Sequence, residues 1–161
     1  MSRNTETNRQ VCGADLTSRR QVFENRVTEL DRSCEGYAKA WAQLRSVLLN
    51  LGGVEVVPPL EHELLLVALL TDGRPDDAER IVRCPGKPSM CHSNIESLLA
   101  DGWRHDAETL TTWRRGYALS DDGLWRSHSW GVLTNGTLVE TTEEREQYFG
   151  VAVDTSHPAT L

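Results

Sequence analysis

Apolar residues recur in alternating steps of four and three positions between residues 23 and 51. This heptad rhythm predicts a long helix with one apolar stripe. Gly36 lies inside the stripe, so a kink or a break into two helices stays open, and Gly52-Gly53 ends the pattern. The stripe consists of Phe23, Val27, Leu30, Cys34, Tyr37, Trp41, Leu44, Leu48 and Leu51. It packs against the rest of the domain or, alternatively, pairs with a second copy in a homodimer through residues 20–51.

Shorter patterns fill the middle of the chain. The apolar piece 54–57 ends at two prolines, and LEHELLLVALL (60–70) predicts a second, largely buried helix. Residues 76–82 predict a third, short helix. A proline-rich loop then leads to a helix at 91–100, with Ser89 as its N-cap and Gly102 at its C-terminal end.

Strand patterns dominate the C-terminal third, in RRGYALS, LWRSHSWGVL, GTLVETT and QYFGVAV. Asn135-Gly136 is a tight-turn signal that joins the middle two strands in a hairpin. The order predicts an α+β fold in one domain, with a helical part at 15–83 and a Cys-bearing helix packed on an antiparallel sheet at 84–154. Residues 1–14 are predicted to be a disordered N-terminus and residues 155–161 a loose tail.

Composition narrows the class of protein. The 161 residues carry 17 Lys and Arg against 24 Asp and Glu, a net charge of −7, which argues against nucleic acid as a partner. The polar N-terminus has no apolar core of a signal peptide, and the longest apolar run, Leu64 to Leu70, is too short to span a bilayer. We therefore expect a cytoplasmic protein with no membrane partner.

Four cysteines, Cys12, Cys34, Cys84 and Cys91, are expected to be free thiols in a reducing compartment. Their spacings match no CxxC pair, so the closely spaced thiolates of a structural zinc site are missing. The sequence also has no GxGxxG, no GxxxxGK[ST] and no HExxH motif. We predict neither a metal nor a cofactor.

Cys91 stands where the fourth helical pattern begins. The positive end of a helix dipole favours a thiolate over a thiol, but a nucleophile also needs a base and a third group that orients the base. His128, in a predicted strand, is the candidate base. Glu140 lies in the strand after the hairpin turn, where it can approach His128 and hold the ring in the tautomer that faces the sulfur. The sequence therefore predicts a catalytic Cys91–His128–Glu140 triad.

Five segments carry a resemblance to known proteins: Cys91-His92-Ser93-Asn94, Gly116-Tyr117-Ala118, His128-Ser129-Trp130, Glu140-Thr141-Thr142 and Tyr148-Phe149-Gly150. Their order resembles papain-like and transglutaminase-like thiol enzymes. More narrowly, residues 88–151 resemble an uncharacterised bacterial and phage family with an NlpC-like or transglutaminase-like Cys-His-acid arrangement. That family has a Cys-x-x-Asn helix start and "GYA", "HAW" and Asp-x-Thr strands; here Ser129 replaces the alanine and Glu140 the aspartate. The resemblance implies a papain-like core and a Cys–His dyad, but no substrate.

Further residues are candidate substrate contacts. His92 points about 100° away from Cys91 around a helix, so it forms a wall or touches the substrate. Asn94 caps the helix or lines an oxyanion site. Trp125 and Trp130 flank the base and shield it from water or form core, and Tyr117 completes the set.

The function that the sequence predicts is that of a papain-like thiol enzyme. It would act on an amide or ester carbonyl of a small molecule, a peptide or a protein, by hydrolysis, deamidation or acyl transfer. The alternative is a non-enzymatic interaction or accessory protein of phage or mobile-element type, which binds a partner through the long helix.

Overall fold

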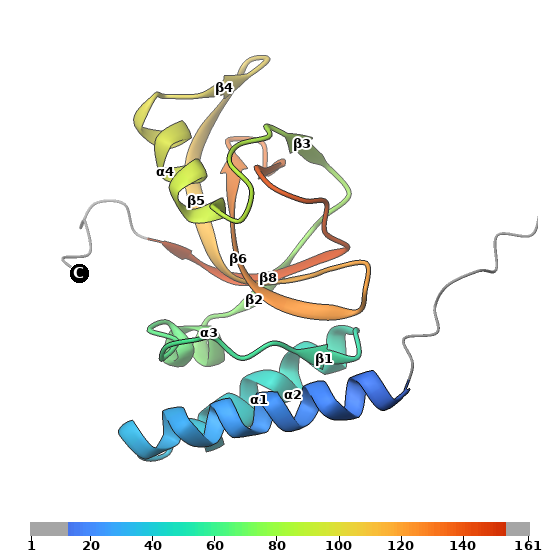
Figure 1. Ribbon diagram of the computed structural model, residues 1–161. Coiled ribbons are helices and arrows are strands. Elements are labelled where there is room, and N and C mark those ends of the chain that lie inside the picture. Colours follow the sequence, from blue (N-terminus) through green and yellow to red (C-terminus); the bar gives the residue numbers. More distant parts are fainter. Residues whose placement is uncertain (1–12, 154–161) are drawn as a thin grey trace, which may run out of the picture.

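The structure, a computed structural model, describes residues 13–153 and has the predicted α+β fold, with helices first and a mostly antiparallel sheet after them (Figure 1). The predicted loose segments at both ends lie outside the described residues, except that residues 13 and 14 belong to the first helix. The elements are α1 (Gly13–Ser33), α2 (Tyr37–Leu51), β1 (Glu55–Val56), α3 (Leu66–Thr71), β2 (Arg74–Asp76), β3 (Ile81–Arg83), α4 (Cys91–Ala100), β4 (Arg104–His105), β5 (Glu108–Leu119), β6 (Leu124–Leu133), β7 (Leu138–Glu140) and β8 (Gln147–Val153).

The apolar stripe near the N-terminus belongs to two helices and not to one. Gly36 adopts a left-handed conformation (φ 86°), which favours glycine, and the chain turns there from α1 into α2. The two helices lie side by side beneath the sheet (Figure 1). The α2 positions of the stripe up to Leu48 are buried against the sheet, whereas Cys34 at the break is exposed. The stripe therefore packs mainly within the domain.

The main path of the sheet runs β2-β8-β5-β6-β7-β3, with β1 beside β6 and β4 beside β5. The pairs β1–β6 and β3–β7 are parallel, and the other pairs are antiparallel. Strands β2 and β3 follow one another in the chain but lie at opposite edges of this path. Ala78 in their connection and Ile81 at the start of β3 pack against the cluster that contains Trp130 and Tyr148, on one face of the sheet.

Side chains alternate between the two faces of the strands, and each face carries a different core. The helix-covered face presents Tyr117, Trp125 and Phe149 to the N-terminal helices. The same face, further along the sheet, packs Trp113 and other side chains against α4. The opposite face, which the β2–β3 connection crosses, carries Trp130 and the residues that share its direction.

Of the two helix predictions between residues 60 and 82, the first is right only for its C-terminal part and the second is wrong. Only residues 66–71 form a helix. Leu60 and Leu64 are 81% and 72% exposed, and the buried residue among positions 60–65 is Glu63. Residues 76–82, predicted as a helix, instead contribute to β2 and β3, which pair with β8 and β7. Hydrogen bonds to distant strands outweigh the weak local preference of this segment.

Helix α4 begins and ends where the sequence predicts. Gly102 follows it in a left-handed conformation (φ 62°), as expected of a C-terminal glycine. The predicted N-cap is wrong: Met90 occupies that position, no side chain caps the helix, and Ser89 is one residue too early with φ 59°.

Candidate active site

The start of α4 is tied to the end of β7 by the loop before it. The amides of Cys84 and Gly86 donate to the carbonyls of Glu140 and Thr141, at 2.9 and 2.8 Å, which extends the β3–β7 pairing. Asn94 holds the same loop: its amide nitrogen donates to the carbonyl of Lys87 at 2.9 Å, and its oxygen accepts from the Lys87 amide at 3.1 Å. Asn94 thus positions the loop and does not cap the helix.

An opening along one edge of β6 receives Cys91. Strand β1 pairs with Leu124 and Trp125, and β7 pairs with Gly131 and Val132. Because β5 occupies the other edge of β6 throughout, β1 and β7 share this one, and residues 126–130 between them have no strand neighbour there. The amide of Ser129 donates instead to the sulfur of Cys91.

The thiol of Cys91 forms a hydrogen bond with the imidazole of His128. Burial raises the pKa of the Cys91 thiol, but this bond, the charge of His128 and the amides of Ser129 and His92 outweigh burial and bring the pKa below its ordinary value. Burial lowers the pKa of His128, yet its bonds to Cys91 and Glu140 leave that pKa raised. Both directions favour a thiolate beside an imidazolium.

Glu140 holds the other side of the His128 ring. The distance from Nε2 of His128 to Oε2 of Glu140 is 2.8 Å, which leaves Nδ1 of the ring for the thiol. His128 is 3% exposed and Glu140 is 1% exposed, so their contact is shielded from water. The hairpin explains the contact: its register pairs Val132 with Leu138, which brings Glu140 to the same face as His128 and one diagonal away.

Glu140 also accepts three further hydrogen bonds. Oε1 accepts from the amide and the hydroxyl of Thr142, at 2.8 and 3.1 Å, and Oε2 accepts from the Tyr148 hydroxyl at 2.9 Å. Burial raises the pKa of Glu140, but His128 and these donors outweigh it, so the pKa is lowered. Burial and the nearby carboxylate raise the pKa of Tyr148, which therefore stays a donor. The carboxylate is charged and fully hydrogen-bonded, as a buried acid needs to be.

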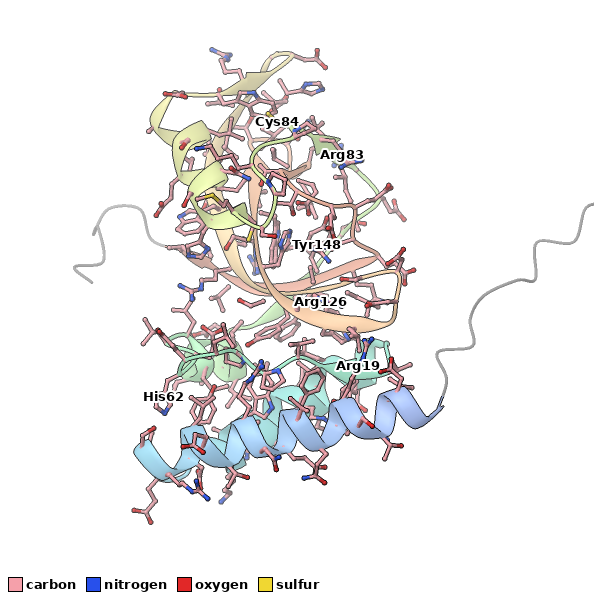
Figure 2. The ribbon with its side chains drawn as sticks, in the orientation of Figure 1. Arg19, His62, Arg83, Cys84, Arg126 and Tyr148 are labelled. Atoms are coloured by element: carbon pink, nitrogen blue, oxygen red, sulfur yellow. The ribbon has the colours of Figure 1, made fainter. Side chains whose placement is uncertain are left out.

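Sequence reasoning named Thr142 and Tyr148 only as parts of motifs and gave them no role. Tyr148 lies on β8, within the sheet (Figure 2), and its side chain is on the same face as His128, opposite the helix-covered one. The alternating pattern of QYFGVAV predicts which residues share a face of the strand with Tyr148. The residues that Tyr148 contacts on other strands depend on the β5–β8 register, which no local signal reveals.

Trp130 supports the imidazole from the same face. Its ring lies nearly parallel to that of His128, with centroids 6.2 Å apart, and its indole N–H donates to Asp76 at 2.8 Å. Arg114 forms an ion pair with the same carboxylate at 2.9 Å. Trp130 is fully buried and belongs to the apolar cluster on this face of the sheet, next to the imidazole.

His92 lies on the helix-covered face, beside Cys91 but turned away from it. Its Nδ1 and the Ser129 hydroxyl share a hydrogen bond, and its ring meets Trp113 edge-on with centroids 4.6 Å apart. Burial and the charge of Arg115 lower the pKa of His92, which keeps the ring neutral near pH 7. His92 is half-buried and forms a wall next to the thiol.

Tyr117 and Trp125, two other predicted contacts, lie in the core under the N-terminal helices. Both are fully buried on the helix-covered face, where Tyr117 donates to Glu63 at 3.2 Å and Trp125 donates to the carbonyl of Gly52 at 2.8 Å. Neither offers surface to a substrate in this arrangement.

The side chains of the other described cysteines and of His62 do not take part in the row formed by Cys91, His128 and Glu140. Cys34 is exposed, Cys84 packs beside α4, and His62 lies with the N-terminal helices, far from Cys84 (Figure 2). Cys12 and His157 lie outside the described residues. In the described part of the chain, no three His, Cys, Asp or Glu side chains are grouped to hold a metal ion, and no helix is long and apolar enough to cross a membrane.

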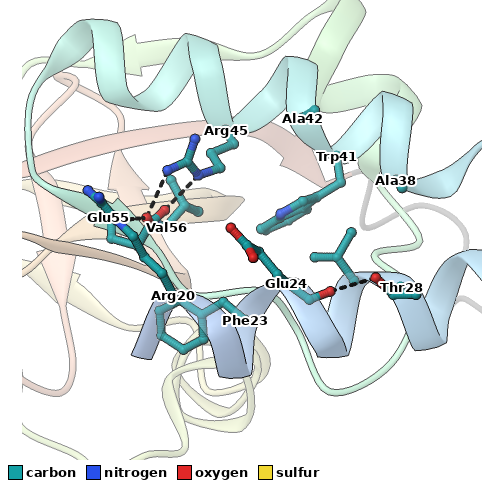
Figure 3. A pocket seen from close by; sticks show the side chains of 11 residues that line it. Arg20, Phe23, Glu24, Thr28, Ala38, Trp41, Ala42, Arg45, Glu55 and Val56 are labelled. Carbon is teal, nitrogen blue, oxygen red and sulfur yellow. Dashed lines mark hydrogen bonds and ion pairs between the residues drawn. The ribbon is translucent and has the colours of Figure 1, made fainter. Parts of the chain in front are cut away.

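A separate cleft of about 310 Å³ lies between α1 and α2 (Figure 3). Glu55 at its side accepts from Arg45 at 2.6 and 2.8 Å and from Arg20 at 3.1 Å, so its charge is satisfied within the fold. Trp41 lines the cleft with its buried ring. This cleft shares no residue with the Cys91 cluster.

Comparison with known proteins gives no match: no family model fits the chain, and neither a curated protein nor a solved structure is significantly similar to it. The chemistry of the site therefore has to be argued from its own geometry.

Proposed function

We propose that this protein is a papain-like thiol enzyme that acts on an amide or ester carbonyl through Cys91. The observation that supports the proposal is the continuous hydrogen-bonded row from the Cys91 thiol through His128 to Glu140. A cysteine that only fills space in the core does not need a hydrogen-bonded imidazole, nor a carboxylate that orients the imidazole, whereas a catalytic cysteine needs both. Cys34 and Cys84 have neither partner in the described residues.

In the first half-reaction, His128 accepts the thiol proton on Nδ1 and the Cys91 sulfur forms a bond to the carbonyl carbon. The electron pair of the C=O bond moves to the oxygen. Collapse of this intermediate breaks the bond to the amine or alcohol, which leaves with the proton from His128. The product is a thioester between the acyl group and Cys91.

The helix start supplies a donor for the developing oxyanion. Cys91 is the first residue of α4, so its N–H has no partner inside the helix. It is therefore the backbone donor that we assign to the oxyanion. Glu140 takes no proton; it stabilises the imidazolium that forms on His128.

Water, an amine or a hydroxyl then attacks the thioester, with His128 as base, and releases the acyl group. Hydrolysis, deamidation and acyl transfer share the first half-reaction and differ only in this second nucleophile and in the leaving group.

A non-enzymatic partner-binding role is the competing proposal. Three large apolar side chains in the described part of the N-terminal helices are exposed: Val47 and Leu51 on α2 and Val22 on α1. A homodimer through residues 20–51 would have to use these side chains. Among the described side chains of α1 and α2, no buried polar atom lacks a partner, so the thiol enzyme is the better-supported proposal.

Limiting iodoacetamide near pH 6 distinguishes the two, with the labelled cysteines identified by mass spectrometry. We expect Cys91 to be labelled well before Cys12, Cys34 and Cys84, and His128→Ala to slow that labelling about tenfold or more. His105→Ala is the matched control, because His105 is an exposed imidazole on β4. If all four thiols react alike, Cys91 is structural and the enzyme proposal fails.

A further inference from the structure

Arg115 has unused hydrogen-bond donors next to the candidate active site. Its side chain is 30% exposed and forms one ion pair, to Glu63 at 3.8 Å, which is too long for a hydrogen bond. Nε of Arg115 is buried without a partner, and no described residue accepts a hydrogen bond from its guanidinium. The preceding residue, Arg114, by contrast donates to the carbonyl of Gly150 at 2.7 Å. A half-buried guanidinium in this state is suited to a bound acceptor.

Arg115 lines a groove of about 740 Å³ on the helix-covered side of the sheet. Ser127 contributes to the same wall, and the segment from Pro59 to Leu64 forms the facing one. Leu60 and Leu64, two of the most exposed large apolar residues in the described chain, stand on that segment. The groove thus pairs an apolar wall with a polar one.

The groove lies close to Cys91 in the β5–β6 ladder. Arg115 pairs with Ser129 across the β5–β6 ladder, and Ser127 lies two residues before Ser129 on the same face, a spacing of roughly 7 Å. Ser129 contacts the Cys91 sulfur through its amide and His92 through its hydroxyl. Arg115, which lines the groove, is therefore the cross-strand neighbour of Ser129, which contacts the thiol.

The charges of the groove favour a neutral acceptor over an anion. Glu63 already faces Arg115, and Glu61 is a second carboxylate of the same groove. Burial and the charge of Arg115 lower the pKa of His92, so its ring adds no positive charge beside the groove near pH 7. An entering carboxylate would meet two like charges, whereas an amide carbonyl accepts from Arg115 without that repulsion.

We propose that this groove binds a peptide chain: a backbone carbonyl accepts from Arg115, an apolar side chain packs on Leu60 and Leu64, and the reacting carbonyl lies at Cys91. This inference rests on the proposed thiol chemistry and names its substrate class, a peptide or protein segment. Arg115 and the two leucines act in recognition, and the bond-making steps stay with Cys91 and His128.

Bromoacetyl peptides test the proposal on the intact protein. The probes are bromoacetyl chains of one, two and three leucine or alanine residues ending in a methylamide, each matched with a bromoacetyl alkylamide of equal length that lacks the inner carbonyls. We expect one peptide length to alkylate Cys91 about tenfold faster than its alkyl match, the effect of one hydrogen bond to a charged donor. Arg115→Gln should abolish that advantage and leave the alkylamide rate unchanged.

Two further variants keep the test decisive. Arg126→Gln is the control. Arg126 lies on β6, forms an ion pair with Asp122 and does not line the groove, so this variant should keep the rate advantage of the peptide. If Arg115→Gln does not fold, Arg115→Lys takes its place, because it preserves the positive charge opposite Glu63. We expect Arg115→Lys to reduce the rate advantage of the peptide as well, because lysine lacks the planar set of donors.

The outcomes separate the two proposals. If iodoacetamide does not label Cys91 before the other thiols, the enzyme proposal fails, and the peptide-binding proposal fails with it. If Cys91 is selected but peptides and alkylamides react alike, only the peptide inference is overturned. A free carboxylate on the probe that raises the rate further, in an Arg115-dependent way, would overturn the neutral-acceptor argument.

Discussion

Replacing Glu140 by glutamine removes one negative charge from the buried cluster at nearly constant volume. The new amide oxygen can accept both hydrogen bonds of Thr142, and the new NH₂ group faces His128 and the Tyr148 hydroxyl. Buried polar groups thus keep partners, so we expect the variant to fold. The NH₂ group donates to Nε2 of His128, which moves the ring proton to Nδ1, and Cys91 then faces an N–H group in place of a base.

The burial of Glu140 sets the size of the effect. At 1% exposure the charge is not screened by water, and a hydrogen bond between charged groups contributes roughly 1.5–3 kcal/mol. At about 1.4 kcal/mol per factor of ten, its loss lowers the population of the Cys91 thiolate and His128 imidazolium about ten- to a hundredfold. Below the pKa of a free thiol, the alkylation rate follows this population.

The assay is the rate of Cys91 alkylation by iodoacetamide between about pH 5 and pH 9. The wild-type rate should rise at a lower pH than that of an ordinary thiol, and the rise of Glu140→Gln should move toward the pKa of such a thiol, about 8.5. Glu143→Gln is the matched control, since Glu143 is three residues away with its side chain 82% exposed. A Glu140→Gln profile that overlays the wild type, while His128→Ala shifts it, would refute the orienting role of Glu140.

Two predictions concern stability. In Gly116→Ala the new Cβ would lie 2.1 Å from the carbonyl oxygen of Phe149, a backbone atom that cannot turn aside, so urea unfolding should show a loss of at least about 2 kcal/mol. Acid should also destabilise the fold through Glu140. Burial raises the pKa of Glu140, but its hydrogen-bond donors outweigh burial, so the pKa in the folded state is lowered. The carboxylate therefore contributes stability above its pKa in the unfolded chain, and this contribution is lost as the pH falls through its pKa in the folded protein. Urea midpoints of wild type and Glu140→Gln should therefore converge below about pH 4, and a gap that stays constant with pH would contradict this.

The sequence predicted the parts of the site that depend on local signals. Helix α4 has an apolar face and a following glycine, and the turn at 135–136 determines how Val132 pairs with Leu138. That register places Glu140 and His128 on one face. The sequence indicated the hairpin, and with it the possible approach of the two side chains, but it did not fix the register. The approach of Cys91 to this hairpin was suggested by the order of the motifs alone.

Segments whose structure depends on distant partners were not predictable. Strands β2 and β3 are three residues each, lie at opposite edges of the main path of the sheet and owe their conformation to β8 and β7. Glu63 is buried where the pattern favours leucines, because Tyr117 reaches it from another part of the chain. The opening on β6 that admits Cys91 exists because β1, from residues 55–56, ends its pairing at Trp125 and β7 begins its pairing only at Gly131. No short-range pattern encodes these pairings.

The most direct measurement of the central claim is the ionisation of Cys91 itself. The ultraviolet absorbance of the thiolate is titrated in the wild type and in Cys91→Ser, and their difference isolates this one sulfur. The account predicts a thiolate that forms below the pH at which an ordinary cysteine ionises, and that His128→Ala shifts toward the ordinary value. A difference titration at or above the pKa of a free thiol, unchanged by His128→Ala, would contradict it.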